Sequence, residues 1–182
     1  MEMIFQYDLA TRTFEGLRHW ERRLSEMAEV FVSKEAVAEI LKVNNPIIYE
    51  VWEVPNVPEK IGQLFWSFTI LYPGKVGNEY YMTKGHYHLD PACAEVYLIL
   101  LGEGVLLLKD NNASKALFVR KGSVAHIPPG CAHRMVNIGN EPLIFFAVYP
   151  AQAGHDYERI KEEGFTIRVI QRGRKPEVCQ DR

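Results

Sequence analysis

The sequence predicts an all-β protein, a small antiparallel barrel or sandwich with one short helix near its N-terminus. From residue 47 onward, short runs of β-branched and aromatic residues follow one another without helical patterns between them. Turn signals such as Pro73-Gly74 and Lys121-Gly122 separate these runs. Closely spaced strands that are joined by turns are typical of sandwiches and barrels.

Residues 1–46 are expected to form an arm and a helix that pack on the barrel or on a second copy of the chain. The helix is predicted from Ser33 to Val43, with Ser33 as its N-cap and Glu35 in its first turn. Pro46 disfavours helical backbone in the residue before it, so the helix should end there. The apolar residues on one face of this helix are Val37, Ile40 and Leu41.

Residues 47–171 are expected to form the barrel, and the polar residues 172–182 a loosely held C-terminal tail. Because side chains alternate along a strand, each strand also predicts which residues face inward. The predicted strands are Ile47–Val54, Leu64–Tyr72, Glu79–Gly85, Glu95–Leu101, Gly104–Lys109, Lys115–Arg120, Val124–Ile127, Leu143–Tyr149 and Phe165–Gln171.

Length and composition indicate a single soluble domain. The chain has 182 residues, of which 47% are hydrophobic and 24% charged, and its net charge is -2. This balance excludes a globally basic nucleic-acid-binding protein, and no apolar run approaches the roughly 20 residues that span a membrane. Cys93, Cys131 and Cys179 fit neither a disulfide framework nor a zinc motif. We therefore expect a cytoplasmic protein that binds neither nucleic acid nor membranes.

Three histidines and one glutamate form the pattern that points to chemistry. His86 and His88 are two residues apart, so an extended strand places both imidazoles on one face. Glu95 opens the next apolar strand, and His133 follows the turn Pro128-Pro129-Gly130. Three neutral imidazoles and one carboxylate around an open position suit a divalent transition metal. The His-x-His pair alone is weak evidence, and the other two residues strengthen it.

These residues stand in two motifs that resemble those of the cupin superfamily. The second cupin motif is matched at every spacing by Gly122, Pro128, Gly130, His133 and Asn137. The first is matched by His86, His88, Glu95 and Gly102. Two features depart from it, because the gap between His88 and Glu95 is longer than usual and Tyr80 stands where a glycine is expected. The resemblance implies a double-stranded β-helix, the jelly-roll barrel of cupins.

Further segments resemble one branch of cupins, the archaeal cupin-type phosphoglucose (glucose-6-phosphate) isomerases, from about Leu24 to Gly164. The resemblance implies interconversion of glucose 6-phosphate and fructose 6-phosphate in glycolysis or gluconeogenesis, a homodimer, and one divalent metal per subunit. Fe²⁺ is the expected metal, with Mn²⁺, Ni²⁺, Co²⁺ or Zn²⁺ as alternatives. Segments that carry the resemblance include Arg23-Leu24-Ser25, Leu71-Tyr72-Pro73-Gly74-Lys75, Thr83-Lys84-Gly85-His86-Tyr87-His88, Ala94-Glu95-Val96-Tyr97 and Gly154-His155-Asp156-Tyr157.

The same resemblance implies roles for individual residues. Glu95 would be the catalytic base, and His155 and Tyr157 would carry protons at the sugar oxygens. The metal ligands would be His86, His88, Glu95 and His133. The substrate contacts would be Tyr49, Thr69, Thr83, Gly85, Tyr97, Phe145 and Tyr149.

Strand alternation tests these assignments. Tyr97 shares a face with Glu95, and Tyr149 shares one with Phe145, as residues of one pocket should. Thr83 and Gly85, however, alternate out of phase with the two histidines that follow them. A bulge near Gly85 would reconcile the two phases, because glycine is the residue that a bulge prefers.

The sequence leaves the reaction route and two other functions open. Proton transfer through a cis-enediolate needs a base near C1 and C2, but a carboxylate that binds a dication loses basicity. A metal-assisted hydride shift avoids that difficulty. A cupin iron dioxygenase would use the same four ligands without needing Thr69, Thr83 and Tyr149. A non-catalytic sugar-phosphate-binding cupin could lose metal ligands, yet all four are present.

Overall fold

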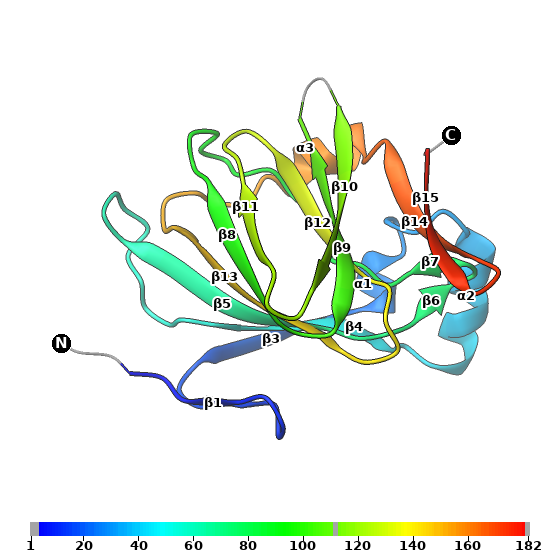
Figure 1. Ribbon diagram of the computed structural model, residues 1–182, viewed down its shortest axis with the longest axis horizontal. Helices are drawn as coiled ribbons and strands as arrows, with labels where there is room; N and C mark the ends of the chain where they lie inside the picture. Colours follow the sequence, from blue (N-terminus) through cyan, green and yellow to red (C-terminus); the bar gives the residue numbers. More distant parts are fainter. Residues whose placement is uncertain (1–3, 111–112, 181–182) are drawn as a thin grey trace.

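The computed structural model describes residues 4–110 and 113–180, which fold mainly into antiparallel strands (Figure 1). Among these residues, a six-stranded sheet has the order β11 (Val124–Ile127), β8 (Glu95–Leu101), β13 (Leu143–Pro150), β5 (Leu64–Leu71), β4 (Ile47–Glu53) and β3 (Arg18–Arg23). A second sheet has the order β10 (Ser114–Arg120), β9 (Glu103–Lys109) and β12 (Ala132–Asn137). The all-β class and the jelly-roll barrel that the cupin resemblance implies are confirmed.

Shorter elements flank the barrel. One further sheet has the order β15 (Lys175–Gln180), β14 (Ile167–Arg172), β7 (Glu79–Tyr80) and β6 (Lys75–Val76). It lies beside the helical segment at one end of the molecule (Figure 1). Near the N-terminus, β1 (Tyr7–Asp8) and β2 (Thr13–Phe14) pair as a hairpin. The described helices are α1 (Leu24–Met27), α2 (Lys34–Val43) and α3 (Tyr157–Glu163).

The helix predicted after Ser33 is confirmed as α2. The Ala36 backbone N–H donates to the Ser33 hydroxyl oxygen at 3.1 Å, so Ser33 is its N-cap, and Val37 is buried. Helix α3 is not predicted by the sequence. Its N-cap is Asp156, whose carboxylate accepts a hydrogen bond from the Arg159 backbone N–H at 3.0 Å. This cap fixes the start of α3, where Tyr157 lies.

Several predictions about strands are wrong in part. Of the strand predicted over Glu79–Gly85, only Glu79–Tyr80 form a strand, β7; Met82 makes an isolated bridge to Val136, and Gly85 has a φ of +77°. The strands β3 and β12 are not predicted, because their sequences are rich in arginine and histidine and lack a run of apolar residues. In β12 these polar side chains are nevertheless buried.

The prediction of a loosely held C-terminal tail is wrong for residues 175–180. They form β15, which pairs with β14 along its whole length, and Val178 packs against the main core. The strand is polar because it contributes few side chains to that core, which is why composition alone suggests a tail. Residues 181 and 182 lie outside the described residues.

The main core lies inside the barrel, and a second apolar cluster lies on the outer face of the six-stranded sheet. The second cluster centres on Phe68 and Ile144. The rings of Tyr7 and Phe14 lie 4.8 and 4.9 Å from that of Phe68, so the N-terminal hairpin covers this face. Buried side chains of the main core include Ile99, Val105, Leu107, Met135 and Phe145.

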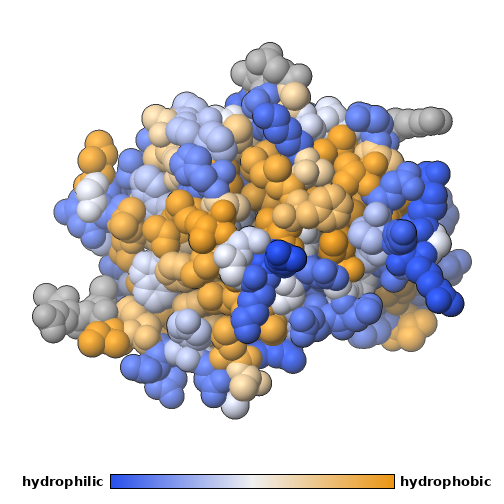
Figure 2. All heavy atoms as spheres, viewed as in Figure 1, coloured by the Kyte–Doolittle hydropathy of each residue, from blue (hydrophilic) through white to orange (hydrophobic). Residues whose placement is uncertain are grey.

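The surface combines hydrophilic residues with apolar ones that gather in the middle of the view in Figure 2. The large apolar side chains that are exposed include Phe118 on β10 and Val124 on β11. No helix in the described part of the chain is both long enough and apolar enough to cross a membrane.

Candidate active site

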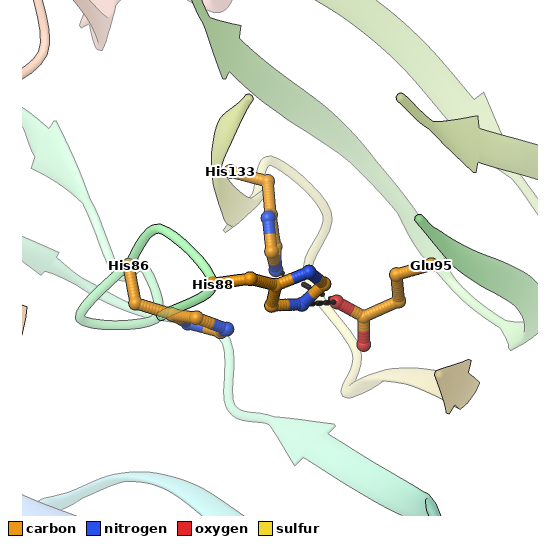
Figure 3. Close-up of side chains that lie close together, drawn as sticks. All are labelled: His86, His88, Glu95 and His133. Carbon is orange, nitrogen blue, oxygen red and sulfur yellow. Dashed lines mark hydrogen bonds and ion pairs between the residues drawn. The ribbon is translucent and has the colours of Figure 1, made fainter. Parts of the chain in front are cut away.

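His86, His88, Glu95 and His133 converge inside the barrel (Figure 3). Each offers one ligand atom, and these atoms all lie within 4.8 Å of one another. Glu95 Oε2 lies 2.9 Å from His133 Nε2 and 3.3 Å from His88 Nε2. Glu95 begins β8 and His133 lies on β12, while both other histidines lie on the irregular segment between β7 and β8.

The backbone holds this irregular segment against β12. The His86 N–H donates to the His133 carbonyl at 3.3 Å, and the His133 N–H donates back to the His86 carbonyl at 3.1 Å. The guanidinium of Arg134 donates to the Lys84 carbonyl from Nε and Nη2, at 3.2 and 2.6 Å. These bonds fix the position of the two histidines without regular strand structure.

Hydrogen bonds to backbone carbonyls determine which ring nitrogen of His88 and of His133 faces the Glu95 carboxylate. His88 Nδ1 lies 3.1 Å from the Cys93 carbonyl oxygen, and His133 Nδ1 lies 3.4 Å from that of Cys131. A carbonyl can only accept, so Nδ1 carries the proton in both rings. In the neutral rings, Nε2 therefore presents a lone pair to the Glu95 carboxylate. Lone pairs that face one another in this way are stabilised by a positive charge between them, which a proton on a ring or a metal ion provides.

The chemistry of these four side chains fits a divalent metal. Among the described residues, the buried Nε2 atom of His86 has no hydrogen-bond partner. Buried polar atoms are nearly always satisfied, and exceptions need an explanation such as an ion. Three imidazole nitrogens and one carboxylate oxygen form a donor set that transition metals accept. The group could therefore hold a metal ion.

The electrostatic environment favours the protonation states that a metal requires. Burial lowers the pKa of His86 well below its usual value, and the imidazoles of His133 and His155 add to this effect. Burial alone would raise the pKa of Glu95, but the charge and hydrogen bonds of His133 and His88 outweigh it and lower that pKa. A neutral imidazole and an ionised carboxylate are the forms that bind metals.

The effects of burial and of neighbouring groups on the pKa balance differently at His88. Burial lowers the pKa of this imidazole, but its hydrogen bonds to Glu95 and to the Cys93 carbonyl, together with the charge of Glu95, raise it overall. The surroundings of His88 therefore favour positive charge at its Nε2 atom, which a metal ion would also provide.

One pocket opens from this group, and it contains every residue that the sequence analysis assigns to substrate or catalysis. Tyr149 lies at the metal end, with its ring 5.8 Å from that of His88. Phe145 lies four residues back along β13, opposite Thr69 of β5. The pocket floor therefore extends roughly 13 Å along the strands from Tyr149 to Phe145. The residues brought together are Tyr49, Thr69, Thr83, Gly85, Tyr97, Phe145, Tyr149, His155 and Tyr157.

The wall opposite the sheet is shaped by Gly85. Gly85 has a φ of +77°, and the antiparallel bridges Met82–Val136 and His86–His133 on either side of it differ in register by one residue. This shift lets Thr83, Gly85 and His86 all line the pocket despite their alternating positions. A Cβ at this position would lie 2.8 Å from the Phe165 ring and 3.1 Å from the His133 carbonyl oxygen. The break in alternation expected at Gly85 is therefore present, and it requires a glycine.

Comparisons with known proteins show the family to which this chain belongs. A family model described as glucose-6-phosphate isomerase matches residues 21–181. The chain belongs to the glucose-6-phosphate isomerase family. It is 45% identical to the glucose-6-phosphate isomerases of Thermococcus onnurineus and Pyrococcus furiosus, and each match covers 96% of this chain and 92% of the relative. The resemblance stated from the sequence is confirmed.

More distant similarities extend beyond the archaeal relatives. A putative glucose-6-phosphate isomerase of Rhizobium meliloti is 35% identical over 85% of this chain and 73% of its own length. A solved oxalate decarboxylase of Lactobacillus farciminis is 23% identical, covering 60% of this chain and 30% of that protein, with a TM-score of 0.46. Membership in the glucose-6-phosphate isomerase family rests on the family model and on the closer relatives.

In this family member, His155 and Tyr157 lie beside the metal group, the four side chains of His86, His88, Glu95 and His133 that could hold an ion. The His155 ring is 4.3 Å from the His86 ring, and it stacks on Tyr157 with an interplanar angle of 7°. Burial lowers the pKa of His155 and raises that of Tyr157, so both side chains are neutral near pH 7. A neutral imidazole and a neutral phenol can each accept or release a proton at a substrate oxygen.

The pocket also contains residues that the sequence analysis did not assign to it. Lys84 places its ammonium group 4.9 Å from the centre of the Tyr157 ring. Trp20, Glu53 and Ser67 also line the pocket. Alternation with Tyr49 along β4 could have indicated Glu53, whereas Trp20 required the unpredicted strand β3.

We predict that His88→Ala lowers both the metal content and the affinity for added metal by about tenfold or more, because even indirect supports of a ligand are worth that factor. Elemental analysis of the purified protein measures this change. His126→Ala is the matched control, since His126 is exposed on β11 and should leave the metal content unchanged. Full occupancy in His88→Ala would remove His88 from the ligand set.

Proposed function

We propose that this protein is a metal-dependent glucose-6-phosphate isomerase that interconverts glucose 6-phosphate and fructose 6-phosphate. The observation that carries the proposal is one pocket that joins a group able to hold a metal ion to a far end lined by hydroxyl groups, in a chain of this family. Relatives that carry the isomerase name match nearly the whole chain. The homodimer and the cytoplasmic location stay predictions from the sequence.

The proposed metal ligands are His86, His88, Glu95 and His133, with Fe²⁺ as the proposed ion. Once bound, the ion supplies positive charge against the oxygens of the reacting carbons. The C1 and C2 end of the sugar should therefore lie beside His155 and Tyr157. These side chains would carry a proton between the two oxygens as the carbonyl moves from one carbon to the other.

Two routes for the hydrogen between C1 and C2 remain within this proposal. In the first, the Glu95 carboxylate removes the proton and returns it to the neighbouring carbon. The lowered pKa of Glu95 weakens it as a base, and its Oε2 atom already faces two imidazoles. In the second, the hydrogen crosses directly with its electron pair, and Glu95 acts only as a ligand.

The far end of the pocket supports phosphate binding. Thr69 and Thr83 present hydroxyl groups, and the Thr83 oxygen accepts a hydrogen bond from the Met135 N–H at 3.1 Å, which leaves its own O–H free to donate. The Gly85 backbone N–H and the Tyr49 hydroxyl would add donors, while Lys84 adds a positive charge. Tyr97, Phe145 and Tyr149 would surround the sugar carbons. An oxygen-activating enzyme would not need this far end.

We predict that the purified protein converts fructose 6-phosphate to glucose 6-phosphate, which a coupled glucose-6-phosphate dehydrogenase assay detects. Treatment with EDTA should abolish most of the activity, and a divalent transition metal such as Fe²⁺ should restore it. Mg²⁺ is the control, since a hard ion with a preference for oxygen ligands suits this donor set poorly. A fully active protein with no bound metal would contradict metal dependence.

We predict that Thr69→Val and Thr83→Val each raise KM for fructose 6-phosphate about tenfold or more. Each variant loses one hydrogen bond to a charged group, which is worth roughly 1.5–3 kcal/mol. Steady-state kinetics measures the change, and binding of unphosphorylated fructose should not weaken. The control is Thr166→Val at an exposed position outside the pocket. Unchanged KM in both pocket variants would place the phosphate elsewhere.

The proton route predicts that isomerisation in D2O leaves deuterium on C1 of fructose 6-phosphate. A proton held by Glu95 can exchange with solvent before it returns, whereas a directly transferred hydrogen cannot. NMR or mass spectrometry of the product measures the label. Absence of deuterium over many turnovers would reject Glu95 as the base and support the hydride shift.

A further inference from the structure

Residues of neighbouring strands form three rows across the floor of the pocket. Successive rows are two residues apart along each strand, which corresponds to roughly 6.6 Å. The first row lies beside the metal group and the third includes the proposed phosphate contact Thr69. From the metal end outward, the rows are Tyr149 and Phe65; Tyr97, Ala147, Ser67 and Glu53; and Phe145, Thr69 and Val51.

The middle row carries a buried carboxylate that the proposed mechanism does not use. Glu53 is 6% exposed and lines the pocket. Its Oε1 atom accepts hydrogen bonds from Nε of Arg18, at 2.5 Å, and from Nη2 of the same side chain. Its Oε2 atom accepts one from the Trp20 indole N–H at 3.0 Å. Arg18 thus balances the charge of Glu53, and Trp20 orients its second oxygen.

This pairing leaves Glu53 able to accept another hydrogen bond. An ionised carboxylate offers about four lone-pair sites, and these contacts use three of them, two on Oε1 and one on Oε2. A buried carboxylate is costly unless it is paired, so the Arg18 contact explains how the charge persists in the pocket. Ser67, its direct neighbour on β5, is also buried and lines the same pocket.

We propose that Glu53 is a specificity-determining residue that accepts hydrogen bonds from hydroxyl groups in the middle of the sugar chain. This inference rests on the proposed function, which places C1 and C2 at the metal end and the phosphate on C6 at the far end. The middle row then faces C3 to C5. A carboxylate there favours a polyhydroxylated chain and disfavours substrates that lack these hydroxyls or carry a second negative charge at this point.

The test compares the parent with Glu53→Ala on fructose 6-phosphate and on its 3-deoxy, 4-deoxy and 5-deoxy forms. We expect Glu53→Ala to lower kcat/KM for fructose 6-phosphate about tenfold or more, the factor that a hydrogen bond to a charged group is worth. For the parent, we expect kcat/KM for at least one deoxy form to be lower than for fructose 6-phosphate by a similar factor. For Glu53→Ala, we expect kcat/KM for that deoxy form and for fructose 6-phosphate to be nearly equal. Such non-additivity identifies a direct contact, which a merely structural role of Glu53 would not produce.

Glu50 provides the matched control. It lies on the same strand with its side chain on the other face, where it accepts a hydrogen bond from the Tyr72 hydroxyl at 2.7 Å. In Glu50→Ala, the loss of kcat/KM on going from fructose 6-phosphate to each deoxy form should equal that of the parent. If Glu53→Ala fails to fold, as circular dichroism would show, Glu53→Gln keeps the side-chain volume and serves in the same comparison.

Equal penalties for all three deoxy forms in the parent and the Glu53 variant would overturn this inference while leaving the isomerase proposal intact. A folded, metal-loaded parent without isomerase activity would instead overturn the proposed function, and this inference with it.

Discussion

The arrangement of this site depends on the convergence of buried electron-pair donors around Glu95. The Nδ1–H groups of His88 and His133 are committed to backbone carbonyls, so the opposite nitrogens face the carboxylate as acceptors. Bringing such groups together without water is unfavourable unless a positive charge lies among them. The barrel nevertheless holds them within 4.8 Å of one another. A metal ion bound among the four side chains would provide that charge.

Much of the surrounding backbone serves to hold that group. The chain between β7 and β8 abandons regular strand structure, and Gly85 adopts a conformation that other residues rarely adopt. Paired backbone hydrogen bonds between His86 and His133 replace the missing ladder. The Asp156 cap fixes the start of α3, where the Tyr157 ring lies 5.5 Å from that of His86. The irregular segment between β7 and β8 thus carries two of the four side chains of this group.

Sequence reasoning reached the donor group because motif spacing records which residues meet in space. His133 is far from His86 along the chain, and only the cupin pattern connects the two before a structure is known. It failed at β12 because that strand buries Arg134 and His133, and buried polar residues do not show the apolar alternation of a strand. It overlooked Glu53 because an acidic residue in a strand ordinarily faces solvent. Only the partners Arg18 and Trp20 explain its burial, and they lie on the unpredicted strand β3.

The most direct test of this account is a crystal of the metal-loaded protein with anomalous diffraction at the absorption edge of the metal. The account predicts one strong peak at roughly 2.0–2.3 Å from the His86, His88 and His133 nitrogens and a Glu95 oxygen. A second acid–histidine group, formed by His19, Glu21 and Glu50 near the surface, provides an internal comparison. A peak at that group alone, or no peak inside the barrel of an active protein, would contradict the account.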